Sequence, residues 1–331
     1  MRIFITGATG YIGQRVMARV LNQGHEIHAL CRRQPDGELF NNPRVKIFKG
    51  DVVNFKTVSD ATADCDQAYH IAAYSRTWAK DVKIFFEVNV KGTANVLEAA
   101  LKANIKKVVV TSTGATYGTS DEKTISETMV RMTDFFTEYE SSKFIAEEKV
   151  HGFLRLGLPV VIVNPGRVYG PGLLSKSNAL SYLIKLYVTG NWHIVPVNGK
   201  TISSYAYIDN VVEGHILAME KGIPGERYIL GGINTDLNTF ISTLQKVSER
   251  HFFLFRVPMH LMLLYGWKEE MLQKFFGCEP QITRKWLKKY NRDTACSSEK
   301  AISELGYVIT PLEEGIKRTL TWILEDLNIH Y

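Results

Sequence analysis

A tyrosine and a lysine four positions apart, Tyr139 and Lys143, have the residue types and the spacing that proton transfer would need. On a helix the two side chains would lie on one face. A phenol with a reference pKa of about 10 is a poor acid or base at neutral pH, but an adjacent ammonium group would stabilise its phenolate form. The same spacing also arises by chance in a chain with 15 tyrosines, so the surroundings of the pair must support it.

Three hydroxyl side chains precede this pair in the chain. The β-branched run at 107–111 predicts a strand, and Thr111, Ser112 and Thr113 stand at its end. A hydroxyl there could hold a substrate oxygen beside the phenol. Thr113 is the first candidate, and Ser112 is either the alternative or a strand residue that faces a packed helix.

Glycines at a spacing of three, Gly7, Gly10 and Gly13, stand between the first expected strand and the first expected helix. Glycine suits a tight turn, a close backbone approach to a pyrophosphate and close packing of the helix on the strand. The helix N-terminus then offers unpaired N–H groups to the phosphates. We therefore predict a dinucleotide site here that also includes Thr9, Tyr11 and Ile12.

Two arginines, Arg32 and Arg33, follow the second expected strand, where an NAD-binding protein usually carries an acidic residue. A guanidinium group matches the 2′-phosphate of NADP. The sequence therefore favours NADP(H), while Asp36 close behind keeps NAD(H) open.

Further along, Asp51 and Val52 follow the third expected strand, and Ala72 and Ala73 follow the fourth. The Asp51 carboxylate could accept a hydrogen bond from the adenine amino group, or it could be an ordinary turn or helix-capping residue. The two alanines are small enough to let a dinucleotide lie across the edge of the sheet.

Short β-branched runs alternate with amphipathic stretches over the first half of the chain. The expected strands are residues 3–6, 26–30, 45–48, 67–71, 107–111 and 160–164, and the expected crossover helices are residues 11–23, 88–103 and 139–156. Parallel strands need such crossovers. We therefore predict an α/β fold with a doubly wound parallel sheet over residues 1–165.

From residue 166 the sequence pattern changes: it predicts loops rich in glycine and proline, followed by a helix-rich remainder. Residues 166–331 are expected to form a smaller, helix-rich substrate lobe. A strand at 203–209 and a helix at 211–218 are expected to return to the sheet, within a returning segment near 203–220. The apolar stretch 252–267 is too short and too interrupted for a membrane span and is expected to be a buried or groove-lining helix, with a membrane-surface helix as the alternative.

Composition sets further limits. The chain has 331 residues, and its net charge of +6 is scattered along the sequence, so nucleic-acid binding gains little support. Its four cysteines show no C-x-x-C pair, which suggests neither a metal site nor a disulfide framework. The N-terminus lacks the features of a signal peptide. We expect a cytoplasmic protein that acts on a small-molecule substrate, and the sequence is compatible with a homodimer.

Together these motifs resemble the extended short-chain dehydrogenase/reductase family, which includes NAD-dependent epimerases and dehydratases. Residues 89–93, 113–118 and 164–171 add to the likeness. The resemblance implies that Tyr139 donates or accepts the proton, that Lys143 binds the nicotinamide ribose and that Thr113 holds the reacting oxygen. It further implies a Rossmann fold and cofactor contacts from Asn89, Pro165 and Val168, although Asn89 fits a structural role better.

The branch within that family is less clear. Gly114 and Ala115 stand where the dehydratases have two acidic residues, and Ser203 stands where many nucleotide-sugar enzymes have an arginine. Residues 70–81 and 139–148 are similar to a subgroup of dihydroflavonol reductase-like proteins and hopanoid-associated sugar epimerases. Tyr74, Trp78 and Tyr169 would line the substrate pocket or pack in the core.

The sequence thus predicts an NAD(P)-dependent oxidoreductase that transfers hydride between the cofactor and a secondary alcohol or ketone. A nucleotide-sugar epimerase is the alternative, and a dinucleotide-binding regulator without turnover is a further one.

Overall fold

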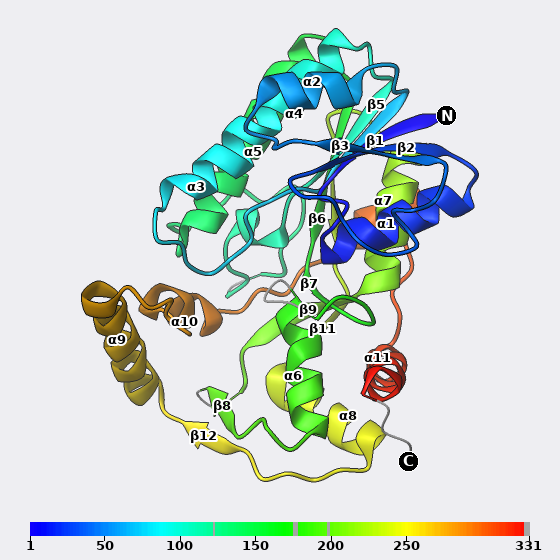
Figure 1. Ribbon diagram of the computed structural model, residues 1–331. Helices are drawn as coiled ribbons and strands as arrows, with labels where there is room; N and C mark the ends of the chain where they lie inside the picture. The colour runs from blue at the N-terminus through cyan, green and yellow to red at the C-terminus, as the bar shows by residue number, and fades with distance from the viewer. Residues whose placement is uncertain (122, 175–177, 197–198, 328–331) are drawn as a thin grey trace.

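Seven parallel strands form the central sheet of the computed structural model, which describes residues 1–121, 123–174, 178–196 and 199–327 (Figure 1). Their order is β10-β6-β5-β4-β1-β2-β3. The strands are β1 (Arg2–Thr6), β2 (Glu26–Cys31), β3 (Val45–Lys49), β4 (Gln67–His70), β5 (Lys107–Thr111), β6 (Val160–Pro165) and β10 (Arg227–Leu230). The predicted doubly wound Rossmann fold is confirmed, and the six expected strands lie within a residue or so of their predicted positions.

Helices cover both faces of this sheet. On one face lie α1 (Tyr11–Asn22) and α7 (Ile208–Lys221), and on the other lie α2 (Phe55–Thr62), α4 (Gly92–Lys102) and α5 (Glu138–Arg155). Successive side chains of a strand point to opposite faces. In β1, Ile3 and Ile5 accordingly join the apolar core under α1 and α7, whereas Phe4 joins the core under α2 and α4. Short helical pieces complete this part: α3 (Lys83–Phe86), η1 (Glu87–Lys91), η2 (Gly114–Tyr117) and η4 (Ala301–Leu305).

The second lobe contains two small sheets and several helices below the main sheet in Figure 1. One sheet has the order β11-β9-β7 and the other pairs β12 with β8. The elements are β7 (Arg167–Tyr169), α6 (Ala179–Val188), β8 (Ile194–Pro196), β9 (Ile202–Tyr207), β11 (Ile233–Asp236), α8 (Leu237–Ser248), β12 (Phe255–Val257), α9 (Met259–Phe276), α10 (Arg284–Tyr290) and α11 (Leu312–Asp326).

The segment that returns to the main sheet differs from the prediction. The expected helix is α7, which packs on β5 and β6. The expected strand, β9, instead pairs with β7 and β11 in the second lobe, and β10 is the strand that extends the main sheet beside β6. We therefore propose a division in which α7 and β10 belong with residues 1–165, and the rest of 166–331 forms the second lobe.

The helix expected at 252–267 also differs from the prediction. Only its second half is helical: residues 259–267 form the start of α9, whereas 252–258 form a loop and β12. Gly266 is the one buried residue of α9, so the helix is neither a core helix nor the lining of a groove. No helix among the described residues is long and apolar enough to cross a bilayer.

Candidate active site

The glycine loop after β1 has the backbone geometry that its sequence predicts. Gly7 has a φ of +75°, which favours glycine, and a Cβ there would lie 2.6 Å from the backbone nitrogen of Ala72. A Cβ at Gly13 would lie 2.0 Å from the carbonyl oxygen of Gly7. Gly10 brings no capping side chain to α1, so the first-turn N–H groups remain available to an anion. The loop therefore fits a pyrophosphate.

A cavity of about 970 Å³ runs from this loop along the carboxyl ends of the strands and into the second lobe. Most of the predicted cofactor residues line it: Gly7, Thr9, Gly10, Tyr11, Ile12, Gly13, Arg32, Asp51, Val52, Ala72, Ala73, Tyr139, Pro165 and Val168. Ligands of doubly wound folds bind at this edge of the sheet. The residues present thus fit a dinucleotide.

Tyr139 and Thr113 meet inside the cavity. The Thr137 hydroxyl caps α5 by accepting a hydrogen bond from the Glu140 N–H at 3.3 Å, which places Tyr139 in the first helical turn. The Thr113 and Tyr139 side chains are hydrogen-bonded. Burial raises the pKa of Tyr139 to about 12, and the hydrogen bond with Thr113 opposes that rise.

Lys143 lies one turn further along α5 and is fully buried. Its ammonium group donates a hydrogen bond of 2.8 Å to the carbonyl oxygen of Thr111. Burial lowers the pKa of Lys143 to about 8, and the Glu147 carboxylate opposes that change. Desolvation is thus the largest influence on the pKa of Tyr139, and Lys143 is hydrogen-bonded to the backbone, so the lowering of the phenol pKa by the ammonium group and a bound nicotinamide stays a prediction.

A residue that the sequence did not single out, Glu147, organises the layer behind this pair. Its carboxylate accepts hydrogen bonds from the Ser112 hydroxyl, from the Asn164 amide at 2.8 Å and from the Arg227 guanidinium at 3.4 Å. Ser112 therefore faces the packed helix, as its structural alternative predicted. Nothing in the sequence marks Glu147, because its partners lie far apart in the chain: Ser112 just after β5, Asn164 in β6 and Arg227 in β10.

Comparison with known proteins identifies the family. The model of the NAD dependent epimerase/dehydratase family matches residues 3–231. The chain belongs to this family. It is 26% identical over 325 residues to a protein named as a dihydroflavonol 4-reductase from Synechocystis sp., with 96% of this chain and 93% of that protein covered. It is 27% identical over 335 residues to sterol demethylase protein B from Methylococcus capsulatus, with 98% and 99% covered.

The solved structure of UDP-glucuronic acid 4-epimerase from Bacillus cereus in complex with NAD has the same fold. It is 22% identical, with a TM-score of 0.80 and with 100% of this chain and 99% of that chain covered. Family and site together make this protein an NAD(P)-dependent oxidoreductase of the extended short-chain dehydrogenase/reductase type.

Several predicted contacts of this enzyme lie elsewhere. Arg33, Asn89 and Lys143 are outside the cavity lining. Arg33 is exposed in the loop after β2, whereas Asn89 is buried and holds the backbone of Tyr74 through both its amide oxygen and its amide nitrogen, at 2.7 and 3.2 Å. The Asp51 carboxylate lines the cavity but also accepts a hydrogen bond from the Val53 N–H at 3.1 Å, so it has the predicted turn role as well.

Of the three residues expected to contact the substrate, only one lines the cavity. Tyr74 lines the cavity, and its hydroxyl donates to the carbonyl oxygen of Trp78 at 3.3 Å. Trp78 is outside the lining. Tyr169 is 1% exposed and packs edge-on against Tyr207 and Phe240, so it belongs to the core of the second lobe.

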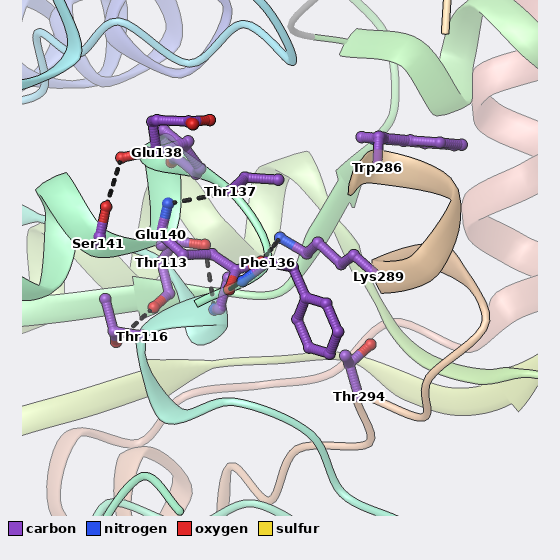
Figure 2. Close-up of polar contacts among 12 residues, drawn as sticks. Thr113, Thr116, Phe136, Thr137, Glu138, Glu140, Ser141, Trp286, Lys289 and Thr294 are labelled. Carbon is purple, nitrogen blue, oxygen red and sulfur yellow. Dashed lines mark hydrogen bonds and ion pairs between the residues drawn. The ribbon is translucent and has the colours of Figure 1, made fainter. Parts of the chain in front are cut away.

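The second lobe reaches the catalytic helix through α10. Lys289 forms an ion pair of 2.8 Å with Glu140, the residue next to Tyr139, and Glu140 also binds Arg131 at 2.8 Å (Figure 2). The Phe136 N–H donates to the same carboxylate at 3.1 Å. These buried contacts fix the start of α5 against the lobe. No sequence motif marked the part of the cavity wall that is formed by Gln281, Trp286, Lys289 and Tyr290.

Removing the charge of Glu147 is expected to weaken the protonation of Lys143. In Glu147→Gln the carboxylate that opposes the desolvation of Lys143 is lost, so the pKa of Lys143 should fall below about 8. Dinucleotide affinity should then decline at a lower pH than in the wild type. Titration of cofactor binding against pH measures this, with the exposed neighbour in Glu148→Gln as control; equal profiles for both variants would contradict it.

Proposed function

We propose that this enzyme reduces the carbonyl group of a mostly apolar or aromatic substrate to a secondary alcohol, with NADP(H) as cofactor. The observation that carries the proposal is the hydrogen-bonded Thr113 and Tyr139 pair, which opens into a cavity shared by the glycine loop and an apolar wall of the second lobe.

The proposed roles follow from the protonation states. With a pKa of about 12, Tyr139 is a phenol at neutral pH, which is the form that donates a proton to a carbonyl oxygen. Thr113 would hold that oxygen through its hydroxyl. Lys143, mostly protonated at neutral pH, would bind the ribose of the cofactor. A bound nicotinamide supplies the hydride, so that one hydride and one proton convert the ketone to the alcohol.

The wall contributed by the second lobe supports an apolar substrate. Leu180, Leu183 and Leu186 of α6 and Leu237 of α8 line the cavity. Burial of an apolar ligand against such side chains contributes roughly 25 cal/mol per Å².

The cationic side chains that the described residues of the second lobe place in the wall, Arg167 and Lys289, already have partners. Arg167 lies 5.2 Å from the centre of the Tyr290 ring and is hydrogen-bonded to that residue, and Lys289 is paired with Glu140. Ser203, where a nucleotide-sugar enzyme would have its arginine, is 1% exposed in β9. A diphosphate entering the cavity would therefore find its charges poorly compensated. The names of the two curated relatives, a dihydroflavonol reductase and a sterol demethylase protein, point to the same substrate class.

Calorimetric titration with UDP and dTDP tests the substrate class. We expect no binding of either nucleotide at micromolar concentration, because Arg167 and Lys289, the cations that the described part of the second lobe places in the cavity wall, are already paired. Micromolar binding of either one would reject the proposal in favour of a nucleotide-sugar epimerase, the activity named for the Bacillus structure.

The preference for NADP(H) rests on Arg32, which lies directly after β2 and lines the cavity. In Arg32→Ala the Kd for NADPH is expected to rise by about 10- to 100-fold, the effect of losing one charge-assisted hydrogen bond, while the Kd for NADH stays nearly constant. Arg33→Ala is the matched control, since Arg33 is outside the lining, and it should change neither constant much. Tighter binding of NADH than of NADPH to the wild type would overturn the preference.

We further propose a cytoplasmic location. All four cysteines lie in the described part of the chain as free thiols, and Cys31, Cys65 and Cys296 are buried. Such cysteine usage fits a reducing compartment.

A further inference from the structure

An apolar stripe lies on the outer side of α9. Its most exposed members are Leu264, Phe275 and Phe276, at 60%, 73% and 74% exposure, and it also includes Leu261, Tyr265 and Leu272. Steps of three and four residues place all of these on one side of a helix. Large exposed apolar patches of this kind mark interaction sites. The neighbouring strand β12 adds Phe255, and Phe253 stands just before it, at 60% and 76% exposure.

The opposite side of α9 packs on α10 and carries Glu270, whereas Glu269 lies at the edge of the stripe, beside Tyr265. Glu270 accepts hydrogen bonds of 2.8 Å from the backbone and the guanidinium of Arg284, and Glu269 accepts one of 3.0 Å from the Gln281 N–H. A Cβ at Gly266 would meet Arg284 and Leu287 at 3.3 Å. In Figure 1, α9 is accordingly the outermost helix on its side, with α10 between it and the rest of the molecule.

Positive charge is concentrated around this stripe. Residues 252–292 contain eight lysines and arginines against three glutamates; Lys285, Lys289 and Arg292 pair with carboxylates outside this segment, whereas Lys268 and Lys274 of α9 are exposed. By its spacing, Lys268 falls within the stripe itself. Both carboxylates of α9 accept hydrogen bonds from residues 281–284, while Lys268 and Lys274 are exposed, so the outer surface is both apolar and positive.

We propose that this surface, the stripe of α9 with Phe253 and Phe255, docks the protein peripherally on an anionic phospholipid bilayer. An apolar helix face flanked by lysine and arginine binds such interfaces by burying its apolar side chains among the lipids and by attracting the headgroups. The charge argues against a second copy as the partner, because a twofold contact along α9 would bring the exposed Lys268 and Lys274 of one copy toward the same lysines of the other.

Docking through α9 would also bring the active-site cavity close to the bilayer. Helix α10 lies against α9 and lines the cavity through Trp286 and Tyr290. A bilayer that covers α9 would therefore lie close to one wall of the active site. An apolar substrate dissolved in the bilayer would have a short route to that site; this consequence rests on the proposed function, whereas the docking itself does not.

Vesicle flotation with the whole protein tests the docking. Wild-type protein should float with phosphatidylcholine vesicles that contain phosphatidylglycerol and much less with phosphatidylcholine alone, and salt should weaken the binding. The triple variant Leu264→Glu, Phe275→Glu, Phe276→Glu should bind at least about tenfold more weakly. The matched control carries Leu156→Glu, Ile223→Glu and Val308→Glu at exposed apolar positions elsewhere and should bind as the wild type does. All three changed side chains of α9 are exposed, so the thermal midpoint should be unaffected.

Three results would overturn the proposal. The first is wild-type protein that stays with the buffer in the presence of anionic vesicles. The second is equal loss of binding in both triple variants. The third is a concentration-dependent dimer, detected by light scattering, that the α9 variant abolishes without any vesicle binding in the wild type. None of these measurements depends on catalysis, so failure of the docking is distinguishable from failure of the proposed reaction.

Discussion

Replacing Tyr139 by phenylalanine is expected to lower kcat by about 10²- to 10⁴-fold, the usual contribution of a general acid, while the Kd for NADPH stays close to that of the wild type. Only the ionisable oxygen is lost, and the ring keeps its place in the first turn of α5. Stopped-flow turnover and fluorescence titration of the cofactor measure the two quantities separately.

A second tyrosine in the same cavity provides the control. Tyr182 lines the cavity from α6 and is 47% exposed. Tyr182→Phe removes a hydroxyl of the same kind without touching Thr113, so its kcat should stay within a few-fold of the wild type. If Tyr139→Phe kept more than about a tenth of native activity, the phenol would have no place in the mechanism.

Below pH 6.5 the free energy of unfolding is expected to fall steeply, because two fully buried histidines resist protonation in the folded state. Burial lowers the pKa of His70 to about 3 and of His215 to about 4, from 6.5 when unfolded. The contribution of the two neutral histidines to the free energy of unfolding is therefore complete above pH 6.5, and it is lost as the pH falls toward their pKa values in the folded protein. Each group adds about 1.4 kcal/mol per pH unit in that window.

Hydrogen bonds fix both histidines as neutral rings. The Nδ1–H of His215 donates to the carbonyl oxygen of Val211 at 2.7 Å, so its Nε2 accepts from the Thr111 hydroxyl at 2.9 Å. In the same way the Thr93 hydroxyl donates to the carbonyl of Asn89, so it accepts from Nε2–H of His70 at 2.9 Å.

Urea unfolding at a series of pH values measures the effect. His215→Gln should reduce the slope of stability against pH between 6.5 and 4 by about one proton. The control is His151→Gln, at an exposed position on α5, which should keep the wild-type slope. If the slope of stability against pH were the same in the wild type and both variants, the buried His215 ring would not be the cause of the pH dependence.

The central sheet was predictable because its strands are buried on both faces. Parallel strands of this kind appear in the sequence as continuous apolar runs, as in β5 and β6. The glycine loop was equally predictable, since the contacts that exclude a Cβ at Gly13 are made within the loop itself. Local sequence is enough where the determining contacts are local.

Where the contacts are remote, the sequence left the alternatives open. Tyr74 and Tyr169 are both tyrosines that follow a buried strand of the main sheet, yet Phe240 of α8 and Tyr207 of β9 draw only Tyr169 into the core. The partner of Lys143 is a backbone carbonyl, which has no sequence signature. Helix α9 is apolar around much of its circumference, so periodicity could not separate a buried helix from an exposed one.

The most direct test of the central claim is the transfer of deuterium from labelled NADPH to a panel of apolar and aromatic ketones. We expect NADPH to be consumed in proportion to the alcohol formed, with the deuterium on the carbinol carbon. The Tyr139→Phe variant should abolish both NADPH consumption and deuterium transfer. A protein that purifies with tightly held NAD, interconverts UDP-sugars and shows no net change in nicotinamide absorbance would contradict it.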